Sequence, residues 1–165
     1  MTMERSVGIR TVVGTLGRLS NAGLPCLLFG GWAEEALGLT APRAHKDIDL
    51  LLPAKSFRGF DQFLAATNDL EEISSKRFAH KRAFLLEGLM VEALLAQREE
   101  CGTRCTWFWG DRRFVWLEPL AAPGALQGTT VTCVSGENLQ RFRALYREIE
   151  PWRWQDPGSL VGSVG

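Results

Sequence analysis

The sequence predicts an α+β fold in which a mixed β-sheet is flanked by helices. Segments whose apolar residues recur at helical spacing alternate with short apolar runs typical of buried strands, and the strand-like runs dominate the middle of the chain. No internal repeat or low-complexity block interrupts this pattern. The 165 residues fit one domain, which we expect over residues 1–150, followed by a tail of loop or disordered chain over residues 151–165.

The chain begins with a predicted helix, strand and second helix. Residues 4–21 carry apolar side chains at helical spacing, and residues 24–29 form a short apolar run typical of a buried strand. The pair Gly30-Gly31 ends this strand. Helical spacing resumes over residues 32–37, so the glycine pair lies between a strand and the start of a helix.

A second strand and a third helix follow a polar loop. Residues 47–52 are strand-like, and Pro53 ends the run. Ser56 stands where an N-cap is expected, and the apolar spacing behind it predicts a helix that ends near Ala66.

The middle of the chain admits two interpretations. Three strands over residues 72–78, 84–86 and 89–95 would form a meander, with Glu87-Gly88 as a hairpin turn. Apolar residues across the last two of these segments also satisfy helical spacing, so a helix is the alternative there.

A hairpin and a strand–helix unit complete the predicted elements. Residues 106–109 and 113–117 flank a Gly-Asp-Arg turn. Residues 131–134 are the last predicted strand, and Ser135 is expected to cap a final helix.

Aromatic residues alternate along the predicted hairpin, and we expect them to pack in the core or to form a homodimer contact: Trp107, Phe108, Trp109, Phe114 and Trp116. His80 precedes Lys81 and Arg82 between two predicted strands, and we expect it in a solvated basic turn.

Charge and hydropathy exclude several classes of protein. Lysine plus arginine and aspartate plus glutamate number 19 each, so the formal net charge is zero. Binding to duplex nucleic acid or to an acidic membrane depends on a basic surface, and the composition argues against both. The sequence has no apolar run of the roughly 18 residues that span a membrane, and its first residues lack the apolar region of a signal peptide. We therefore expect a cytoplasmic protein.

Two aspartates at the start of the second strand indicate a metal site. Residues two apart on a strand point to the same face, so Asp47 and Asp49 present their carboxylates side by side. Two like charges this close are costly unless a cation neutralises them. Carboxylate oxygens favour Mg²⁺ or Mn²⁺.

The glycine pair indicates a phosphate site. Without side chains at Gly30 and Gly31, the backbone can approach a ligand closely, and the N–H groups at the start of the following helix can bind a phosphate. Phosphate at the glycines and metal at the aspartates together describe a site for a nucleoside triphosphate.

The motif G-G-W-A, an intervening helix and then R-x-H-x-D-I-D-L resembles the nucleotidyltransferase superfamily, and most closely its aminoglycoside 2″- and lincosamide-nucleotidyltransferase group. The resemblance covers residues 24–53 and extends weakly to residues 91–93 and 134–139. It implies a nucleoside triphosphate substrate and Mg²⁺, as two ions with Mn²⁺ as a substitute. A nucleoside monophosphate would pass to a hydroxyl of a small molecule, such as an aminoglycoside or lincosamide antibiotic, with release of pyrophosphate.

The resemblance also implies a role for individual residues. Asp47 and Asp49 would ligate the metals and take part in catalysis. Glu92 is the candidate for the third catalytic and metal-binding carboxylate, with an exposed strand edge as the alternative and Glu87 as a rival acid. The implied nucleotide-binding residues are Gly30, Gly31, Arg43, His45 and Lys46. The alternatives are a loop-ordering role for Arg43 and His45 and a solvated loop position for Lys46.

The sequence departs from the family pattern in three places. The family often has Asp where Glu92 stands, many relatives have an acid where Lys46 stands, and the chain after Asn138 is short. Two other functions stay open: a toxin-type nucleotidyltransferase acting on a protein or a tRNA, and a nucleotide-binding module of the same fold without catalysis. The presence of both Asp47 and Asp49 counts against the module.

Overall fold

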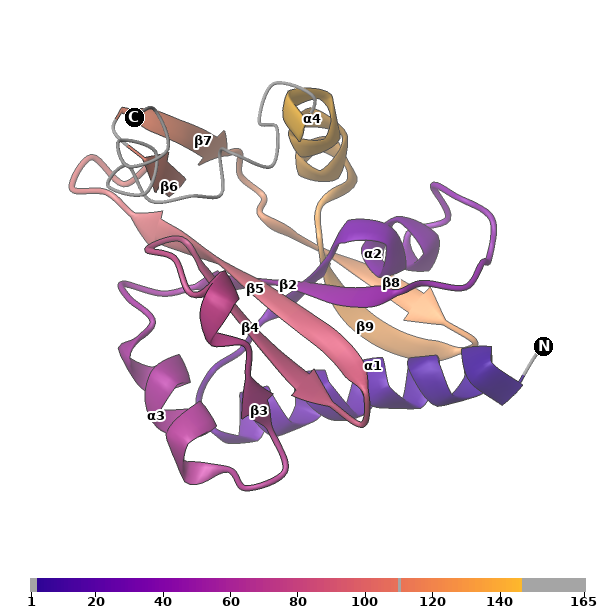
Figure 1. The fold of residues 1–165 in the computed structure, drawn as a ribbon. Coiled ribbons are helices and arrows are strands. Elements are labelled where there is room, and N and C mark those ends of the chain that lie inside the picture. The colour runs from indigo at the N-terminus through magenta and orange to yellow at the C-terminus, as the bar shows by residue number, and fades with distance from the viewer. Residues whose placement is uncertain (1–2, 110, 147–165) are drawn as a thin grey trace, which may run out of the picture.

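The computed structural model describes residues 3–109 and 111–146, so the expected tail over residues 151–165 lies outside the described part of the chain. Helices and strands alternate as the sequence predicts (Figure 1). The helices are α1 (Met3–Asn21), α2 (Gly30–Ala36), α3 (Arg58–Ala66) and α4 (Gly136–Tyr146), with a 3₁₀ turn η1 (Ser74–Lys76). The strands are β1 (Leu27–Phe29), β2 (Asp47–Pro53), β3 (Glu71–Glu72), β4 (Lys81–Leu86), β5 (Leu89–Arg98), β6 (Arg104–Trp109), β7 (Arg112–Trp116), β8 (Ala121–Leu126) and β9 (Thr129–Val134).

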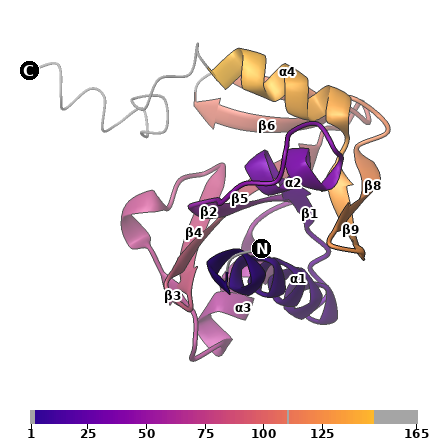
Figure 2. The same cartoon turned by 90° about the vertical axis from the view of Figure 1, so that its right-hand side faces the viewer.

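The strands form one mixed sheet. Its order is β3-β4-β5-β2-β1-β9-β8, and the hairpin β6–β7 pairs with the far end of β5. Strand β2 is antiparallel to β1 but parallel to β5, and β1 is parallel to β9. Helices α1 and α3 lie on one face of the sheet, and α2 and α4 lie on the other (Figure 2). The predicted class, a mixed sheet flanked by helices, is confirmed.

A tight turn between β4 and β5 decides between the two interpretations of the middle of the chain. Glu87 and Gly88 have φ of 52° and 78°, as the two central residues of a type I′ hairpin turn require. The turn pairs Leu86 with Leu89 and so fixes the register of the whole hairpin. The meander is therefore correct for these two strands, and the helical alternative is wrong.

The segment before this hairpin differs from the prediction. Instead of a strand over residues 72–78, the chain forms the two-residue strand β3 and then the turn η1. Strand β4 begins at Lys81, earlier than expected. The 3₁₀ turn brings Lys76 toward the sheet, which an extended chain from residue 72 to residue 78 would not do.

Two further predictions need correction. Helix α3 begins at Arg58, so Phe57 stands at the N-cap position expected for Ser56, although the Ser56 hydroxyl accepts a hydrogen bond of 3.2 Å from the Arg58 amide. Strand β8 was not predicted, because Pro123 and Gly124 are rare inside strands. It lies at the edge of the sheet, where a proline is tolerated, and pairs with β9.

An aromatic cluster joins the β6–β7 hairpin to helix α4. Phe114 and Trp116 are buried and pack against Phe142, with the Trp116 and Phe142 ring centroids 5.9 Å apart in a stacked arrangement. The Phe29 ring meets Phe142 edge-on at 5.0 Å. Core packing, one of the two roles expected for the hairpin aromatics, is thus confirmed at these positions.

The prediction for His80 is wrong. Its side chain is 2% exposed and lies between the rings of Phe78 and Phe108, at 5.6 and 5.2 Å. Burial and the nearby ammonium of Lys81 lower the pKa of His80 to about 4.

Among the described residues, no helix is both long and apolar enough to cross a membrane.

Candidate active site

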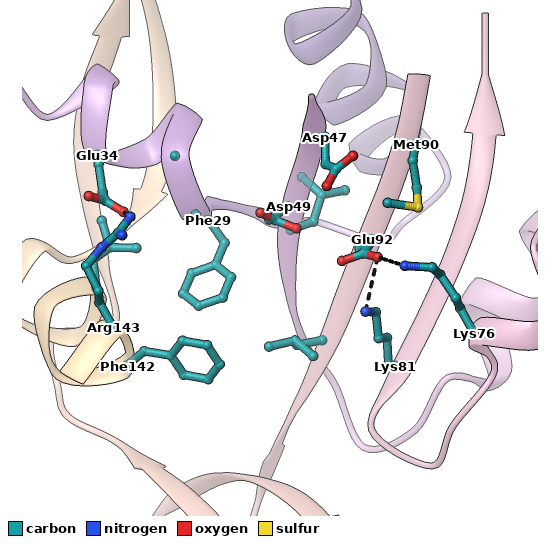
Figure 3. A pocket seen from close by; sticks show the side chains of 15 residues that line it. Phe29, Glu34, Asp47, Asp49, Lys76, Lys81, Met90, Glu92, Phe142 and Arg143 are labelled. Atoms are coloured by element: carbon teal, nitrogen blue, oxygen red, sulfur yellow. Dashed lines mark hydrogen bonds and ion pairs between the residues drawn. The ribbon is translucent and has the colours of Figure 1, made fainter. Parts of the chain in front are cut away.

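A pocket of about 450 Å³ lies between the sheet and the helices α2 and α4 (Figure 3). Its charged lining residues are Glu34, Asp47, Asp49, Lys76, Lys81, Glu92 and Arg143. Its larger apolar lining residues are Phe29, Leu50, Met90, Leu94, Leu139 and Phe142. Acidic, basic and aromatic groups therefore share one cavity, with the three predicted carboxylates on its sheet side.

The pairing of β2 with β5 brings the three carboxylates together. The strands are parallel, and their register sets Asp49 opposite Glu92 and Asp47 opposite Met90. Partners in a parallel pair point to the same face of the sheet, and so do residues two apart on one strand. Asp47, Asp49 and Glu92 therefore point into the same pocket, as Figure 3 shows.

The crowding of negative charge changes how the aspartates titrate. Burial of the Asp49 carboxylate, together with the charges of Glu92 and Asp47, raises the pKa of Asp49 from 3.8 to about 7. Burial and the charge of Glu92 also raise the pKa of Asp47. Each aspartate is thus less stable as an anion here than in water, and a cation nearby would relieve that cost.

Glu92 is held by two lysines. Its Oε1 accepts from Lys76 Nζ at 2.8 Å, and Lys81 Nζ lies 3.1 Å from the same oxygen. Burial alone would raise the pKa of Glu92, but the ammonium groups of Lys81 and Lys76 outweigh it and lower the pKa below its ordinary value. Glu92 is therefore ionised at neutral pH.

The donor set fits a hard divalent cation at the aspartate pair. Asp47 and Asp49 offer carboxylate oxygens from one face of one strand, and burial together with the neighbouring acids raises the pKa of both. Within residues 3–109 and 111–146, no group of three or more His, Cys, Asp or Glu side chains is arranged to hold one metal ion. Glu92 is paired with lysines instead, so its role as a third metal ligand stays a prediction.

The two glycines allow helix α2 to begin directly beside the carboxylates. Gly30 has φ of 63°, and a Cβ atom there would collide with the Asp49 carboxylate. A Cβ atom on Gly31 would lie 2.8 Å from both the Arg43 guanidinium and the His45 ring. Both glycines line the pocket, and phosphate binding by them stays a prediction.

The other predicted nucleotide-binding residues lie beside the pocket instead of in its lining. His45 Nε2 is 3.0 Å from Glu35 Oε1, and the backbone N–H of Arg43 donates to that same oxygen at 3.0 Å. The side chains of His45 and Glu35 are buried, and the His45 ring packs on Trp32 at 4.3 Å. Lys46 is exposed. These contacts order the segment that leads into Asp47, and nucleotide binding by Arg43, His45 and Lys46 stays a prediction.

Sequence reasoning missed several lining residues. Lys76 lines the pocket because it ends a 3₁₀ turn, and no pattern in the sequence predicts that turn. Lys81 opens β4, and its closeness to Glu92 depends on the hairpin register, which pairs Lys81 with Leu94. Arg143 of α4 pairs with Glu34 of α2 on the side of the pocket away from the three carboxylates (Figure 3). The Glu87-Gly88 turn was the one signal that could have placed Lys81 on the face that carries Glu92.

Comparison with known proteins finds solved structures that share this fold. No family model and no curated protein matches the sequence. Several solved structures are similar, and three of them are described below. The lincosamide antibiotic adenylyltransferase LnuA with lincomycin bound has a TM-score of 0.64 and 16% identity, over 88% of each chain. ANT(2″)-Ia in complex with adenylyl-2″-tobramycin has a TM-score of 0.62 and 16% identity, over 91% of this chain and 79% of that one. A Thermotoga maritima protein provisionally assigned as a nucleotidyltransferase has a TM-score of 0.55 and 18% identity, over 88% of each chain.

Proposed function

We propose that this chain, which has the fold of the nucleotidyltransferases, is a metal-dependent enzyme that transfers a nucleoside monophosphate from a nucleoside triphosphate to a hydroxyl group of a small molecule. The observation that carries the proposal is the convergence of Asp47, Asp49 and Glu92 on one pocket through the β2–β5 register. The resemblance of the sequence motif and the similarity of the fold point to the same chemistry.

Asp47 and Asp49 are the residues that would hold the metal. A divalent cation bound there would neutralise both carboxylates and stabilise the negative charge that develops on the phosphate oxygens. Gly30 and Gly31 let the backbone at the start of α2 approach the triphosphate from the side of the pocket next to Asp49.

Glu92 is proposed to accept the proton of the acceptor hydroxyl. The hydroxyl oxygen forms a bond to the α-phosphorus as the bond between that phosphorus and the bridging oxygen breaks, and pyrophosphate leaves with that electron pair. The two lysines keep Glu92 ionised at neutral pH, so its carboxylate carries no proton and can accept one once a substrate anion takes its place at the lysines.

The pocket supports a small acceptor. Its volume of about 450 Å³ is in the range of sites for small ligands. Phe29 and Phe142 lie across the pocket from the carboxylates (Figure 3), and Leu139 also lines the pocket, so a sugar ring or an alkyl group can pack against an apolar surface. We propose hydroxylated antibiotics of the aminoglycoside or lincosamide type as the first acceptors to test.

The experiment is a transfer assay with each of the four nucleoside triphosphates, labelled at the α-phosphate, in the presence of Mg²⁺ or Mn²⁺. Acceptor mixtures would be analysed for a product heavier by one nucleoside monophosphate and for an equal amount of pyrophosphate. Asp47→Asn and Asp49→Asn should each lower the rate at least ~100-fold, while Lys55→Met, an exposed position outside the pocket, should not.

Three other outcomes would contradict the proposal. Label that is incorporated only into protein or tRNA would support the toxin-type activity instead. Binding of nucleotide without transfer to any acceptor would support a non-catalytic module. Transfer that persists in both aspartate variants would place the reaction at another site.

A further inference from the structure

We propose that Lys76 and Lys81 form an anion-binding subsite, filled in this structure by the side chain of Glu92 and filled during the reaction by an anionic group of a substrate. The inference rests on the proposed function, because it concerns the same pocket. It assigns to the two lysines a direct contact with substrate that the sequence motif does not include.

The geometry is that of two ammonium groups around one oxygen. Lys76 Nζ and Lys81 Nζ approach the same atom, Glu92 Oε1, at 2.8 and 3.1 Å. They come from different elements, since Lys76 ends the turn η1 and Lys81 begins β4. Figure 3 shows both side chains reaching Glu92 from the side of the pocket away from α2. A carboxylate between two lysines is bound as an external carboxylate or phosphate would be.

The charge balance favours a second anion. Glu92 contributes one negative charge and the two lysines contribute two positive charges. The Lys81 and Glu92 side chains are only 11% and 16% exposed, so water screens their charges poorly, whereas the Lys76 side chain is 37% exposed. Asp47 and Asp49 supply negative charge nearby, but a divalent cation at that pair would offset it. With the metal bound, the lysines would retain one unit of positive charge to share with a substrate.

Two groups of the proposed reaction carry suitable anions. One is the triphosphate, whose terminal phosphates become pyrophosphate. The other is an acidic group on the acceptor. The triphosphate is the first candidate because Gly30, Gly31, Lys76 and Lys81 line one continuous pocket. In either case Glu92 yields its place at the lysines, which leaves its carboxylate able to accept the proton of the acceptor.

The experiment measures binding of pyrophosphate by titration calorimetry in an Asp47→Asn/Asp49→Asn background with EDTA present, so that neither a metal ion nor the charges of the aspartate pair contribute. Lys76→Met and Lys81→Met should each weaken binding about tenfold, while Lys55→Met, an exposed lysine outside the pocket, should have no effect. Glu92→Gln should tighten binding several-fold, because it removes the internal competitor. In the Lys76→Met/Lys81→Met background, Glu92→Gln should give no tightening, since no subsite remains.

A parallel titration with malonate distinguishes the two sources of the anion. Lysine-dependent binding of pyrophosphate supports a phosphate subsite, and lysine-dependent binding of malonate alone supports a subsite for an acidic acceptor. The inference is overturned if the lysine variants fold, as judged by circular dichroism, and bind pyrophosphate and malonate as tightly as the protein with both lysines. It is also overturned if Glu92→Gln weakens pyrophosphate binding. Lysine-dependent binding without any nucleotidyl transfer would leave the subsite standing and remove the proposed function. Nucleotidyl transfer without lysine-dependent anion binding would support the proposed function and remove the subsite.

Discussion

Asp49 and Glu92 lie directly opposite each other in the parallel pairing of β2 with β5, so two acids far apart in the sequence share one face of the sheet. With Asp47 beside them, this arrangement concentrates three carboxylates where the protein covers them from solvent. Folding the chain therefore works against ionisation of the two aspartates, and the pKa values of Asp47 and Asp49 are raised as a result. The same strain would be released by a bound divalent cation, which links the stability of the fold to the proposed chemistry.

The first prediction concerns the stability of the metal-free protein with pH. The pKa of Asp49 is 3.8 ordinarily and about 7 in the folded chain, so between these values the folded state holds a proton that the unfolded state has lost. Asp49 should therefore lower the free energy of unfolding as pH rises from about 4 to about 7, by on the order of 4 kcal/mol. Urea denaturation should show that Asp49→Asn removes this decrease and is more stable than the wild type at pH 8.

Mg²⁺ supplies the control for this prediction. Added to the wild-type protein at pH 8, it should raise the stability, and added to Asp49→Asn it should have a much smaller effect. If the free energies of unfolding of the wild type and of Asp49→Asn changed in parallel from pH 4 to pH 8, the pKa of Asp49 would not be raised in the folded protein.

The second prediction concerns His80, whose pKa is lowered from 6.5 to about 4 by burial and by Lys81. Between these values the unfolded chain binds a proton that the folded chain does not. His80 should therefore contribute stability at pH 7 that is lost as pH falls toward 4, by on the order of 3 kcal/mol. Because this dependence opposes that of Asp49, the two partly cancel in the wild type.

Single variants should separate the two dependences. His80→Gln has no titratable group at this position, so it should become more stable relative to the wild type as pH falls from 6.5 to 4, as measured by urea denaturation. A double variant with Asp49→Asn should be nearly independent of both groups over this range. If the free energy of unfolding of His80→Gln and of the wild type changed with pH in the same way between pH 4 and pH 6.5, His80 would be protonated in the folded protein.

The parts of the site that could be predicted from the sequence are those fixed by local geometry. Strand periodicity alone puts Asp47 and Asp49 on one face, and Gly30-Gly31 marks the point where β1 turns into α2. The Glu87-Gly88 turn could also be predicted, because few dipeptides adopt two positive φ angles in succession. Glu92 could be named as a candidate, but its position opposite Asp49 needed the parallel register.

The features that could not be predicted depend on tertiary pairing. Lys81 reaches Glu92 only because β4 and β5 share a register, and Lys76 reaches it through a 3₁₀ turn. His80, next to two basic residues, has the local sequence of an exposed turn, yet two aromatic rings enclose it. Strand β8 is defined by pairing with β9, which compensates for the poor strand propensity of Pro123.

The third prediction separates the two requirements at Gly30. Gly30 and Gly38 both have positive φ, of 63° and 75°, but a Cβ atom would meet the Asp49 carboxylate at Gly30 and no atom within 4 Å at Gly38. Gly38→Ala should therefore cost only the backbone strain, about 1 kcal/mol. Gly30→Ala should cost more than Gly38→Ala in urea denaturation and should also weaken Mn²⁺ binding, because it displaces Asp49. If Gly30→Ala and Gly38→Ala lowered the free energy of unfolding equally, the Asp49 side chain would be able to move away from the added Cβ atom at no cost.

The fourth prediction concerns the segment that leads into Asp47. Glu35 is 9% exposed, and its Oε1 lies 3.0 Å from both the Arg43 amide nitrogen and His45 Nε2. Removing a buried acceptor leaves its donors without that partner, so Glu35→Ala should lower the free energy of unfolding by about 2–4 kcal/mol. Glu35→Gln keeps an acceptor oxygen at the same place and should cost less.

The adjacent acid provides the matched control. Glu34 pairs with Arg143, whose side chain is 64% exposed, so Glu34→Ala should cost at most about 1 kcal/mol. Glu35→Ala should also weaken Mn²⁺ binding, measured by paramagnetic resonance, because the loop that Glu35 orders continues directly into Asp47. If Glu35→Ala were less stable but bound Mn²⁺ as tightly as the wild type, the loop would support the fold without positioning the carboxylates. Weakened Mn²⁺ binding with stability intact would instead assign Glu35 to the site and not to the fold.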